Sequence, residues 1–145
     1  MIDKFMYKYH FLSNFAVCKI PYNGMLYRTA EAAFQAQKTL DKNKRRKYLN
    51  CTPSQAKKWG RCEDLRPDWE DIKLQIMYEV LKAKFKYNPE MREDLLATGD
   101  ELLVEGNTWG DTYWGVCRCS GKGENHLGEI LMRVRRELRD QLKLD

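Results

Sequence analysis

The sequence has no apolar run that approaches the ~20 residues needed for a membrane-spanning helix. Its first segment, Met1–His10, alternates polar and apolar residues and contains no apolar stretch typical of a secretory signal. Repeats, low-complexity tracts and linkers rich in Pro, Gly or Ser are also absent. These absences exclude a spanning helix, a signal peptide and a fibrous architecture, and we expect one cytoplasmic domain over residues 1–145.

Histidine is scarce, and no strong excess of charge is present. The two histidines, His10 and His126, stand beside no nucleophile motif, which argues against a Ser-His-Asp triad. The net charge of +5, from 26 Lys and Arg against 21 Asp and Glu, is too small for a dedicated DNA-binding protein. Two basic stretches, Lys42–Lys47 and Arg133–Arg139, are interpreted as solvated helix faces, with a phosphate-attracting surface as the alternative.

The five cysteines match neither a disulfide framework nor a zinc site. Their number is odd and no secretion signal precedes them, so reduced thiols are expected. Cys117 and Cys119 form a C-x-C pair, but two further ligands at the characteristic spacing of a zinc site are missing. We therefore expect no metal site.

Helix signals dominate the remaining pattern. Caps, proline at first helical positions and apolar periodicity predict helices over residues 30–40, 42–49, 53–60, 69–86, 89–99 and 127–142. Gly60 is expected to end the third of these in a left-handed conformation. The first 28 residues favour short extended segments, with a hairpin around Asn23-Gly24, and residues 102–105 and 114–119 also favour strands. The expected class is α+β, a predominantly helical single domain with a small antiparallel sheet, since Rossmann and P-loop motifs are missing.

The helix after Thr29 carries the first candidate site. Glu31, Gln35 and Lys38 are spaced to project from one side of it. The opposite side carries the apolar residues Ala33, Phe34 and Leu40, which are expected in the core. Glu31 either completes the cap and complements the helix dipole, or points a carboxylate into a cleft where its neighbours bind polar substrate atoms.

Two glycine-rich loop segments carry the other candidates. In Asp111-Thr-Tyr-Trp114-Gly115 an acid lies three residues before a tryptophan that either fills the core or stacks on a planar base. The segment Ser120–Gly128 leads into the last helix with Asn125 as a natural cap, an arrangement found in ordinary loops and in phosphate-binding helix N-termini. Two carboxylates beside stacking aromatics suit cleavage of a glycosidic bond, because one protonates the leaving nitrogen while the other stabilises the cationic sugar or activates water. Such cleavage is expected to need no organic cofactor.

The sequence resembles the YbiA-like, or NADAR, family over about residues 10–138. The matching segments are Phe11–Phe15, Tyr27–Glu31 with Gln35 and Lys38, Pro53–Lys57, Gly60-Arg61, Asp68-Trp69, Met77, Lys84-Phe85, Leu95–Gly99, Leu103–Glu105, Asp111–Gly115, Gly123–Gly128, Leu131-Met132 and Arg135. Two positions depart from the family pattern. Ala32 stands where many relatives have histidine, and Trp114-Gly-Val-Cys117 replaces Trp-Gly-x-Gly.

The resemblance implies an α+β, mostly helical N-glycosidase. Characterised members release ribose 5-phosphate from early riboflavin intermediates, the 5-amino-6-ribosylamino-pyrimidine phosphates, or remove ADP-ribose from guanine in nucleic acid. A non-catalytic ADP-ribose or nucleotide-binding module is the remaining alternative. The resemblance implies a metal-free site with Glu31 and Asp111 as catalytic carboxylates in unassigned roles, lined by Trp69, Trp114, Asn14, Lys38 and Asn125. Gln35, on the same helix side as Glu31, is expected to bind substrate. The expected partner is a small phosphorylated ribosyl-amine, with ADP-ribosylated nucleic acid as the alternative, and the protein is expected to be a monomer or weak oligomer.

Overall fold

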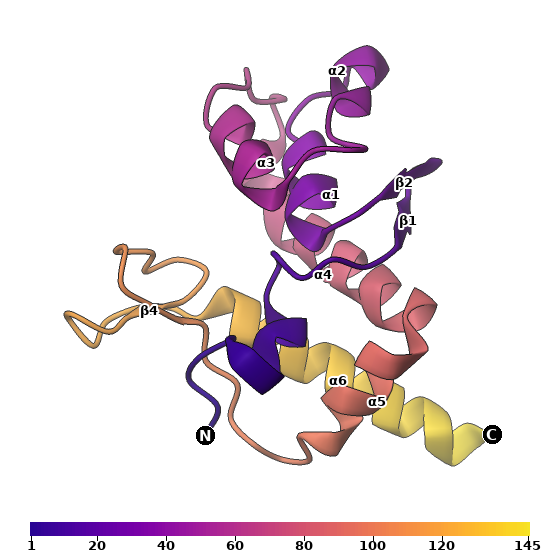
Figure 1. Ribbon diagram of the computed structural model, residues 1–145, viewed down its shortest axis with the longest axis vertical. Helices are drawn as coiled ribbons and strands as arrows, with labels where there is room; N and C mark the ends of the chain where they lie inside the picture. Colours follow the sequence, from indigo (N-terminus) through magenta and orange to yellow (C-terminus); the bar gives the residue numbers. More distant parts are fainter. The chain divides into compact units, whose positions relative to one another are not determined.

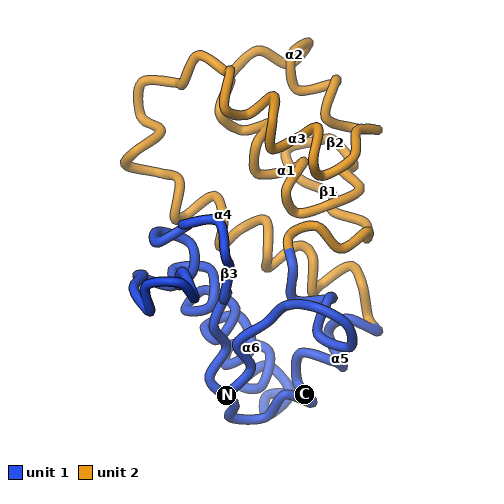
Figure 2. Tube along the Cα trace, turned by 60° about the vertical axis from the view of Figure 1, so that its left-hand side comes forward, with its two compact units in different colours: residues 1–13, 90–145 blue, residues 14–89 orange.

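The computed structural model describes residues 1–145, and helices account for about half of them (Figure 1). The chain forms two compact units, one of residues 14–89 and one that combines residues 1–13 with residues 90–145 (Figure 2). The expected α+β, predominantly helical class is confirmed. None of the helices combines the length and apolar character required to cross a membrane.

The unit of residues 14–89 begins with the expected hairpin. Strands β1 (Ile20–Tyr22) and β2 (Met25–Tyr27) pair antiparallel, with Ile20 opposite Tyr27. Asn23 and Gly24 both have positive φ, 48° and 78°, as a two-residue type I′ turn requires. The sequence therefore predicted the position of this turn correctly, although the strands are shorter than the flanking segments expected at residues 17–21 and 25–28.

Four helices follow in the same unit: α1 (Ala30–Ala36), α2 (Lys42–Arg46), α3 (Pro53–Gly60) and α4 (Trp69–Tyr87). Helix α1 packs against α3 and α4. The apolar periodicity of α4 predicts one buried stripe, which is confirmed for Ile76, Met77, Val80, Leu81 and Phe85. Ile72, the sixth residue of the predicted stripe, is only partly buried. Thr52 and Gln55 form a reciprocal capping box at the start of α3, so the boundaries predicted for that helix are confirmed as well.

Helix α1 ends four residues before the expected boundary, Leu40. The amides of Gln37 and Lys38 bond to the carbonyls three positions back, those of Phe34 and Gln35, so the last turn tightens. Leu40 consequently lies outside the helix and is 61% exposed. The expectation that Leu40 belongs to the core was wrong, because the helical periodicity used to assign it does not extend that far.

The other unit contains the 3-10 helix η1 (Tyr7–Leu12), α5 (Pro89–Ala97), β3 (Gly106–Asn107), β4 (Val116–Cys117) and α6 (His126–Leu144). The expectation of an extended N-terminus was wrong at η1, where i+3 hydrogen bonds form instead. Strands β3 and β4 pair in parallel, so of the two strand pairs only the hairpin is antiparallel as expected. Within residues 102–105, Leu103 forms a single bridge, to Ile2.

Candidate functional site

Helix α1 holds the first group of candidate residues. Thr29 caps it, since its Oγ1 accepts the Ala32 N–H at 3.0 Å, and the Asn14 carbonyl accepts the Glu31 N–H at 3.0 Å. Every residue of α1 is buried, including Glu31 and Gln35. The helix therefore lacks the polar and apolar faces expected from its sequence, and the Glu31 carboxyl group lies within the packed part of its unit.

The side chains of Glu31 and Gln35 are hydrogen-bonded to each other. Gln35 Nε2 donates to Glu31 Oε1 at 2.9 Å, while Gln35 Oε1 lies against Gly60. A Cβ atom on residue 60 would lie 1.9 Å from that oxygen, far inside van der Waals contact. Gly60 is helical rather than left-handed, so the predicted reason for a glycine there was wrong. Residue 60 is glycine because the Gln35 amide occupies the space of a side chain.

Lys38 and Trp69 lie beside this pair. Lys38 Nζ donates to the Gly60 carbonyl at 3.2 Å and lies 6.0 Å from the centre of the Trp69 ring, within cation–π range. The Trp69 ring packs on Phe34, with ring centres 5.1 Å apart. Burial lowers the pKa of Lys38, and the Glu31 carboxylate acts in the opposite direction by favouring the charged amine.

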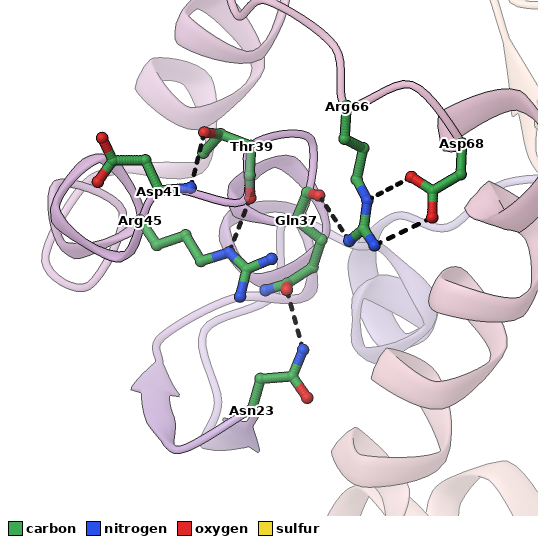
Figure 3. Close-up of polar contacts among 7 residues, drawn as sticks. All are labelled: Asn23, Gln37, Thr39, Asp41, Arg45, Arg66 and Asp68. Carbon is green, nitrogen blue, oxygen red and sulfur yellow. Dashed lines mark hydrogen bonds and ion pairs between the residues drawn. The ribbon is translucent and has the colours of Figure 1, made fainter.

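A polar network fixes the segment that carries Lys38 (Figure 3). The fully buried Gln37 donates from Nε2 to the Ala33 carbonyl at 3.0 Å and accepts from Asn23 Nδ2 at 3.1 Å. Arg66 approaches the Gln37 carbonyl and pairs with Asp68 through two hydrogen bonds of 2.7 and 3.2 Å. Because Asp68 immediately precedes Trp69, the same network orients the start of α4 relative to the segment after α1.

Two buried oxygens in this unit have no hydrogen-bond partner, Asn14 Oδ1 and Gln35 Oε1. Asn14 is 8% exposed, and its Nδ2 lies 3.6 Å from the Met77 sulfur. A buried polar atom without a partner costs about 1–3 kcal/mol, so protein interiors rarely retain one. Both oxygens belong to residues that the sequence singled out, and each can accept a hydrogen bond from a hydroxyl or amine of a ligand.

Lys84 is a candidate that the sequence reasoning did not single out as a site residue. Its side chain is fully buried, and burial lowers its pKa to about 8, although the Cys18 thiolate favours the charged amine. Buried lysines with strongly lowered pKa values are typical of functional sites. The signal was present in the sequence, because Lys84 follows Val80 by four positions and Leu81 by three and so falls on the apolar stripe of α4.

Asp111, in the other unit, is positioned by its own loop and by Asn107. Asn107 accepts the Asp111 N–H at 3.0 Å and donates to the Asp111 carbonyl at 2.8 Å. The Asp111 carboxylate accepts the N–H groups of Tyr113 and Trp114 on one oxygen, Oδ1, at 3.1 and 2.9 Å. Both of these hydrogen bonds go to Oδ1, as in an Asx turn.

Trp114 belongs to an aromatic cluster with Tyr113 and His126. The ring centres of Tyr113 and Trp114 are 4.9 Å apart, those of Tyr113 and His126 are 4.5 Å apart, and both pairs are tilted or edge-on. Trp114 is half-buried, and His126 Nε2 lies 3.3 Å from the exposed Glu124 carboxylate. The sequence singled out Trp114 as a candidate. It did not predict the ring contacts of Tyr113 and His126, which form because the start of α6 packs beside the loop that carries Tyr113.

Of the two interpretations of the segment before α6, the hydrogen bonds favour the ordinary loop over a phosphate cradle. The N–H groups of Glu124, Asn125, His126 and Leu127 donate to the carbonyls of Thr112, Gly115, Tyr113 and Trp114. These bonds satisfy the amides that a bound phosphate needs. Asn125 stands at the N-cap position, but its side chain does not cap the helix: Oδ1 accepts the Glu105 N–H at 2.9 Å, and Nδ2 donates to the Leu103 carbonyl at 3.0 Å.

The candidate residues thus form two groups. Asn14, Glu31, Gln35, Lys38 and Trp69 belong to the unit of residues 14–89, and Asp111, Trp114 and Asn125 belong to the other. No group of three or more His, Cys, Asp or Glu side chains is arranged to hold a metal ion.

Comparison with known proteins gives consistent matches. The sequence model of the NADAR domain family matches residues 3–139 of this chain. The N-glycosidase YbiA of Shigella boydii serotype 4 is 43% identical over 136 residues, which cover 92% of this chain and 81% of that protein. The riboflavin biosynthesis protein VVA0006 of Vibrio vulnificus is 38% identical over 133 residues, which cover 90% of this chain but 36% of that protein. The NMR structure of the E. coli protein YbiA superposes with a TM-score of 0.87 at 39% identity, covering 100% of this chain and 88% of that chain.

Proposed function

This chain belongs to the NADAR family and is an enzyme that hydrolyses N-glycosyl bonds, and we propose that its substrate is a phosphorylated ribosyl-amine of early riboflavin biosynthesis. The bond that breaks joins C1′ of the ribose to the amine of a 5-amino-6-ribosylamino-pyrimidine phosphate. Water supplies the hydroxyl group at C1′ and the proton for the leaving amine, so the products are ribose 5-phosphate and the free pyrimidine. The relation to a riboflavin biosynthesis protein supports this choice of substrate class.

The observation that carries the proposal is the buried pair of Glu31 and Gln35 with its neighbouring oxygens. Glu31 is 8% exposed, so its carboxyl group is shielded from bulk water. Electrostatic stabilisation of a cationic sugar is stronger in such a shielded site than in water. The unpartnered oxygens of Gln35 and Asn14 can accept hydrogen bonds from ribose hydroxyls. Lys38 donates one hydrogen bond to the Gly60 carbonyl, and its ammonium group has further N–H groups for a phosphate oxygen.

Asp111 supplies the second carboxylate of the proposed mechanism. Its Oδ1 is held by two backbone N–H groups, so Oδ2 can hold the attacking water or pass a proton to the leaving amine. Glu31 and Asp111 are the two proposed catalytic carboxylates, and which of them performs which task is left open. Trp114 supplies a half-buried ring on which the pyrimidine stacks, an interaction worth about 1–3 kcal/mol per base. Trp69 is 4% exposed and therefore forms a wall of the site rather than an open stacking face, while Asn125 positions the loop.

The test is to incubate the purified protein with the ribosylamino-pyrimidine 5′-phosphate and to identify the products by mass spectrometry. We expect ribose 5-phosphate and free pyrimidine from the wild type and a loss of at least about 100-fold in Glu31→Gln and Asp111→Asn. The exposed acids Glu90 and Asp140 provide the matched controls Glu90→Gln and Asp140→Asn, which should retain wild-type turnover. Wild-type turnover in both folded site variants contradicts the mechanism.

A parallel reaction with an oligonucleotide that carries ADP-ribosylated guanine distinguishes the alternatives left open by the sequence. Release of ADP-ribose from the oligonucleotide, without cleavage of the pyrimidine substrate, assigns the protein to the reversal of guanine modification. Tight binding of ADP-ribose without any released base identifies a binding module instead. Either result replaces the riboflavin intermediate as the proposed ligand.

A further inference from the structure

Arg66, in the segment that joins α3 to α4, connects two stretches of the unit of residues 14–89 that carry candidate residues. Its backbone N–H donates to the Lys38 carbonyl at 2.9 Å, and its own carbonyl accepts the Trp69 N–H at 3.1 Å. Pro67 follows Arg66, and the residue before a proline favours an extended backbone, in keeping with the position of Arg66 outside both helices. Lys38 and Trp69 are therefore linked by two backbone hydrogen bonds through a single residue.

The side chain of Arg66 strengthens this link (Figure 3). Nε and Nη2 donate to the two carboxylate oxygens of Asp68 at 2.7 and 3.2 Å, and Nη1 lies 3.5 Å from the Gln37 carbonyl oxygen. The Arg66 side chain is 17% exposed. A bidentate pair between a guanidinium and a carboxylate has a fixed geometry, so Asp68 orients the guanidinium toward the Gln37 carbonyl.

The carbonyls of residues 37–39, just after α1, all accept hydrogen bonds from arginines. The carbonyls at the end of a helix need partners from outside the helix, and positive charge is favourable there. Arg66 supplies the partners of the first two carbonyls, and Arg45 Nε donates to the third, that of Thr39, at 2.9 Å. These bonds fix the backbone on both sides of the Lys38 side chain.

The Lys38 ammonium group is held at the other end of that side chain. Nζ donates to the Gly60 carbonyl at 3.2 Å and lies 6.0 Å from the centre of the Trp69 ring. Lys38 is half-buried, whereas Trp69 is 4% exposed, so the lysine is the accessible member of the pair. A shift of the Lys38 backbone or of Trp69 would displace the ammonium group relative to its contacts.

We propose that Arg66 is a positioning residue that holds the Lys38 ammonium group where it binds the phosphate of the substrate. This inference rests on the proposed function, in which Lys38 donates to a phosphate oxygen. Arg66 acts without touching the phosphate, because its charge is paired with Asp68 and its N–H groups are directed at that carboxylate and at the Gln37 carbonyl. Loss of the Arg66 side chain should therefore weaken recognition of the phosphate more than cleavage of the C1′–N bond.

The experiment measures kcat/KM of the full-length protein for the ribosylamino-pyrimidine 5′-phosphate and for the same ribosylamine without phosphate. The ratio of the two values is the phosphate preference. We expect Arg66→Met to lower this preference by about 10-fold, through a higher KM for the phosphorylated substrate, and Lys38→Met to lower it at least as far. Arg46→Met, which removes an exposed arginine of α2, is the matched control and should leave the preference unchanged.

Two further variants distinguish positioning from direct contact with the phosphate. Arg66→Lys keeps the charge but cannot form the bidentate pair, so it should lose the preference as Arg66→Met does. The double variant of Arg66→Met and Lys38→Met should lose no more preference than Lys38→Met alone, because Arg66 acts through Lys38. Additive losses, or a preference retained in Arg66→Lys, identify a direct phosphate ligand and overturn the proposal. Equal losses on both substrates in Arg66→Met identify a merely structural role and also overturn it.

Amide hydrogen exchange followed by NMR provides a readout that needs no substrate. The N–H groups of residues 66 and 69 should exchange faster in Arg66→Met than in the wild type, and unchanged exchange contradicts the link. Where Arg66→Met does not fold, Asp68→Asn, which weakens the same pair at an exposed partner, should lower the preference by about 2–5-fold. A wild type that cleaves neither ribosylamine overturns the proposed function itself. An active wild type whose preference persists in the folded variants overturns only the role of Arg66.

Discussion

The side-chain amide of Asn107 brackets the backbone of Asp111, accepting its N–H at 3.0 Å and donating to its carbonyl at 2.8 Å. Asn107 is 1% exposed, and its Nδ2 also donates to Glu105 Oε2 at 3.0 Å. Every polar atom of this side chain therefore supports the loop that carries Asp111. If Asp111 is catalytic as proposed, Asn107 is a positioning residue, which acts through Asp111 without touching the substrate.

Replacing Asn107 by aspartate tests this role. The introduced carboxylate can still accept the Asp111 N–H, but it cannot donate to the Asp111 carbonyl and it brings a second negative charge beside Glu105. We expect a fall in kcat with little change in KM and a loss of about 1–3 kcal/mol in the free energy of unfolding. Steady-state kinetics and urea unfolding measure both effects, with the exposed Asn43→Asp as the control. A change in KM alone contradicts the positioning role.

Gly60→Ala should disturb Glu31 without changing any charge. The added Cβ would lie 1.9 Å from Gln35 Oε1, so the Gln35 amide has to move and its hydrogen bond to Glu31 is broken or lengthened. We expect a loss of about 1–3 kcal/mol in stability together with reduced turnover, because overpacking displaces neighbouring side chains. Lys58→Ala, in the same helix, is the control and should leave both unchanged. Full activity in a folded Gly60→Ala variant shows that the Gln35 amide is not needed.

Lys84 should make stability depend on pH in a defined direction. The pKa of Lys84 is lowered from 10.5 to about 8 in the folded protein. Between about pH 8 and pH 10.5, the Lys84 amine is therefore protonated in the unfolded chain but not in the folded one. The contribution of Lys84 to the free energy of unfolding therefore rises with pH across this interval, by about 3 kcal/mol, and is constant below pH 8. The neighbouring Cys18 thiol, whose pKa is raised by burial, contributes in the opposite direction.

The measurement for Lys84 is urea unfolding from about pH 7 to 11 in the wild type, Lys84→Met and the exposed control Lys82→Met. We expect the rise in stability in the wild type and in Lys82→Met, and its absence in Lys84→Met. Parallel pH profiles for all three proteins contradict a buried amine with a lowered pKa.

The variant Asn125→Asp tests whether the Asn125 side chain caps α6 or instead holds the segment of Leu103 and Glu105 by hydrogen bonds. Aspartate is as good a cap as asparagine, so a capping role predicts almost no change in stability. The structure instead requires Nδ2 to donate to the Leu103 carbonyl, and aspartate cannot donate this bond. We expect a loss of about 1–3 kcal/mol in the free energy of unfolding, measured by thermal or urea unfolding. Glu129→Gln, in the first turn of α6, is the control for a change of charge at this helix end.

The parts of the fold that were predicted correctly depend on neighbours in the chain. The hairpin turn at Asn23-Gly24, the cap at Thr29 and the boundaries of α3 each follow from residues within a few positions of one another. The stripe of α4 follows from periodicity over several turns of a helix. The candidate residues were found in the same way, but Glu31 and Gln35 were expected on a polar face, whereas all of α1 is buried.

Two wrong expectations, at Leu40 and at η1, come from local i+3 hydrogen bonds, whereas the others involve partners farther away in sequence. The phosphate cradle before α6 is occupied by carbonyls of residues 112–115, and the Asn125 side chain is used by Leu103 and Glu105. Gly60 faces the Gln35 amide instead of adopting a left-handed turn. No local pattern could show these contacts, because each needs two segments to approach each other in the folded chain.

The sequence by itself determined the positions of the α-helices, the caps at Thr29 and Thr52, the turn of the hairpin and the residue types available for chemistry. Hydrogen bonding within one turn and the periodicity of apolar side chains are local properties. Tertiary structure decided which side-chain oxygens remain without a hydrogen-bond partner and which backbone N–H groups already donate a hydrogen bond. It also decided that the Lys84 side chain is buried away from solvent. A side chain loses contact with solvent and gains hydrogen-bond partners from distant segments only when those segments pack together. These properties therefore cannot be read from the neighbouring residues in the sequence.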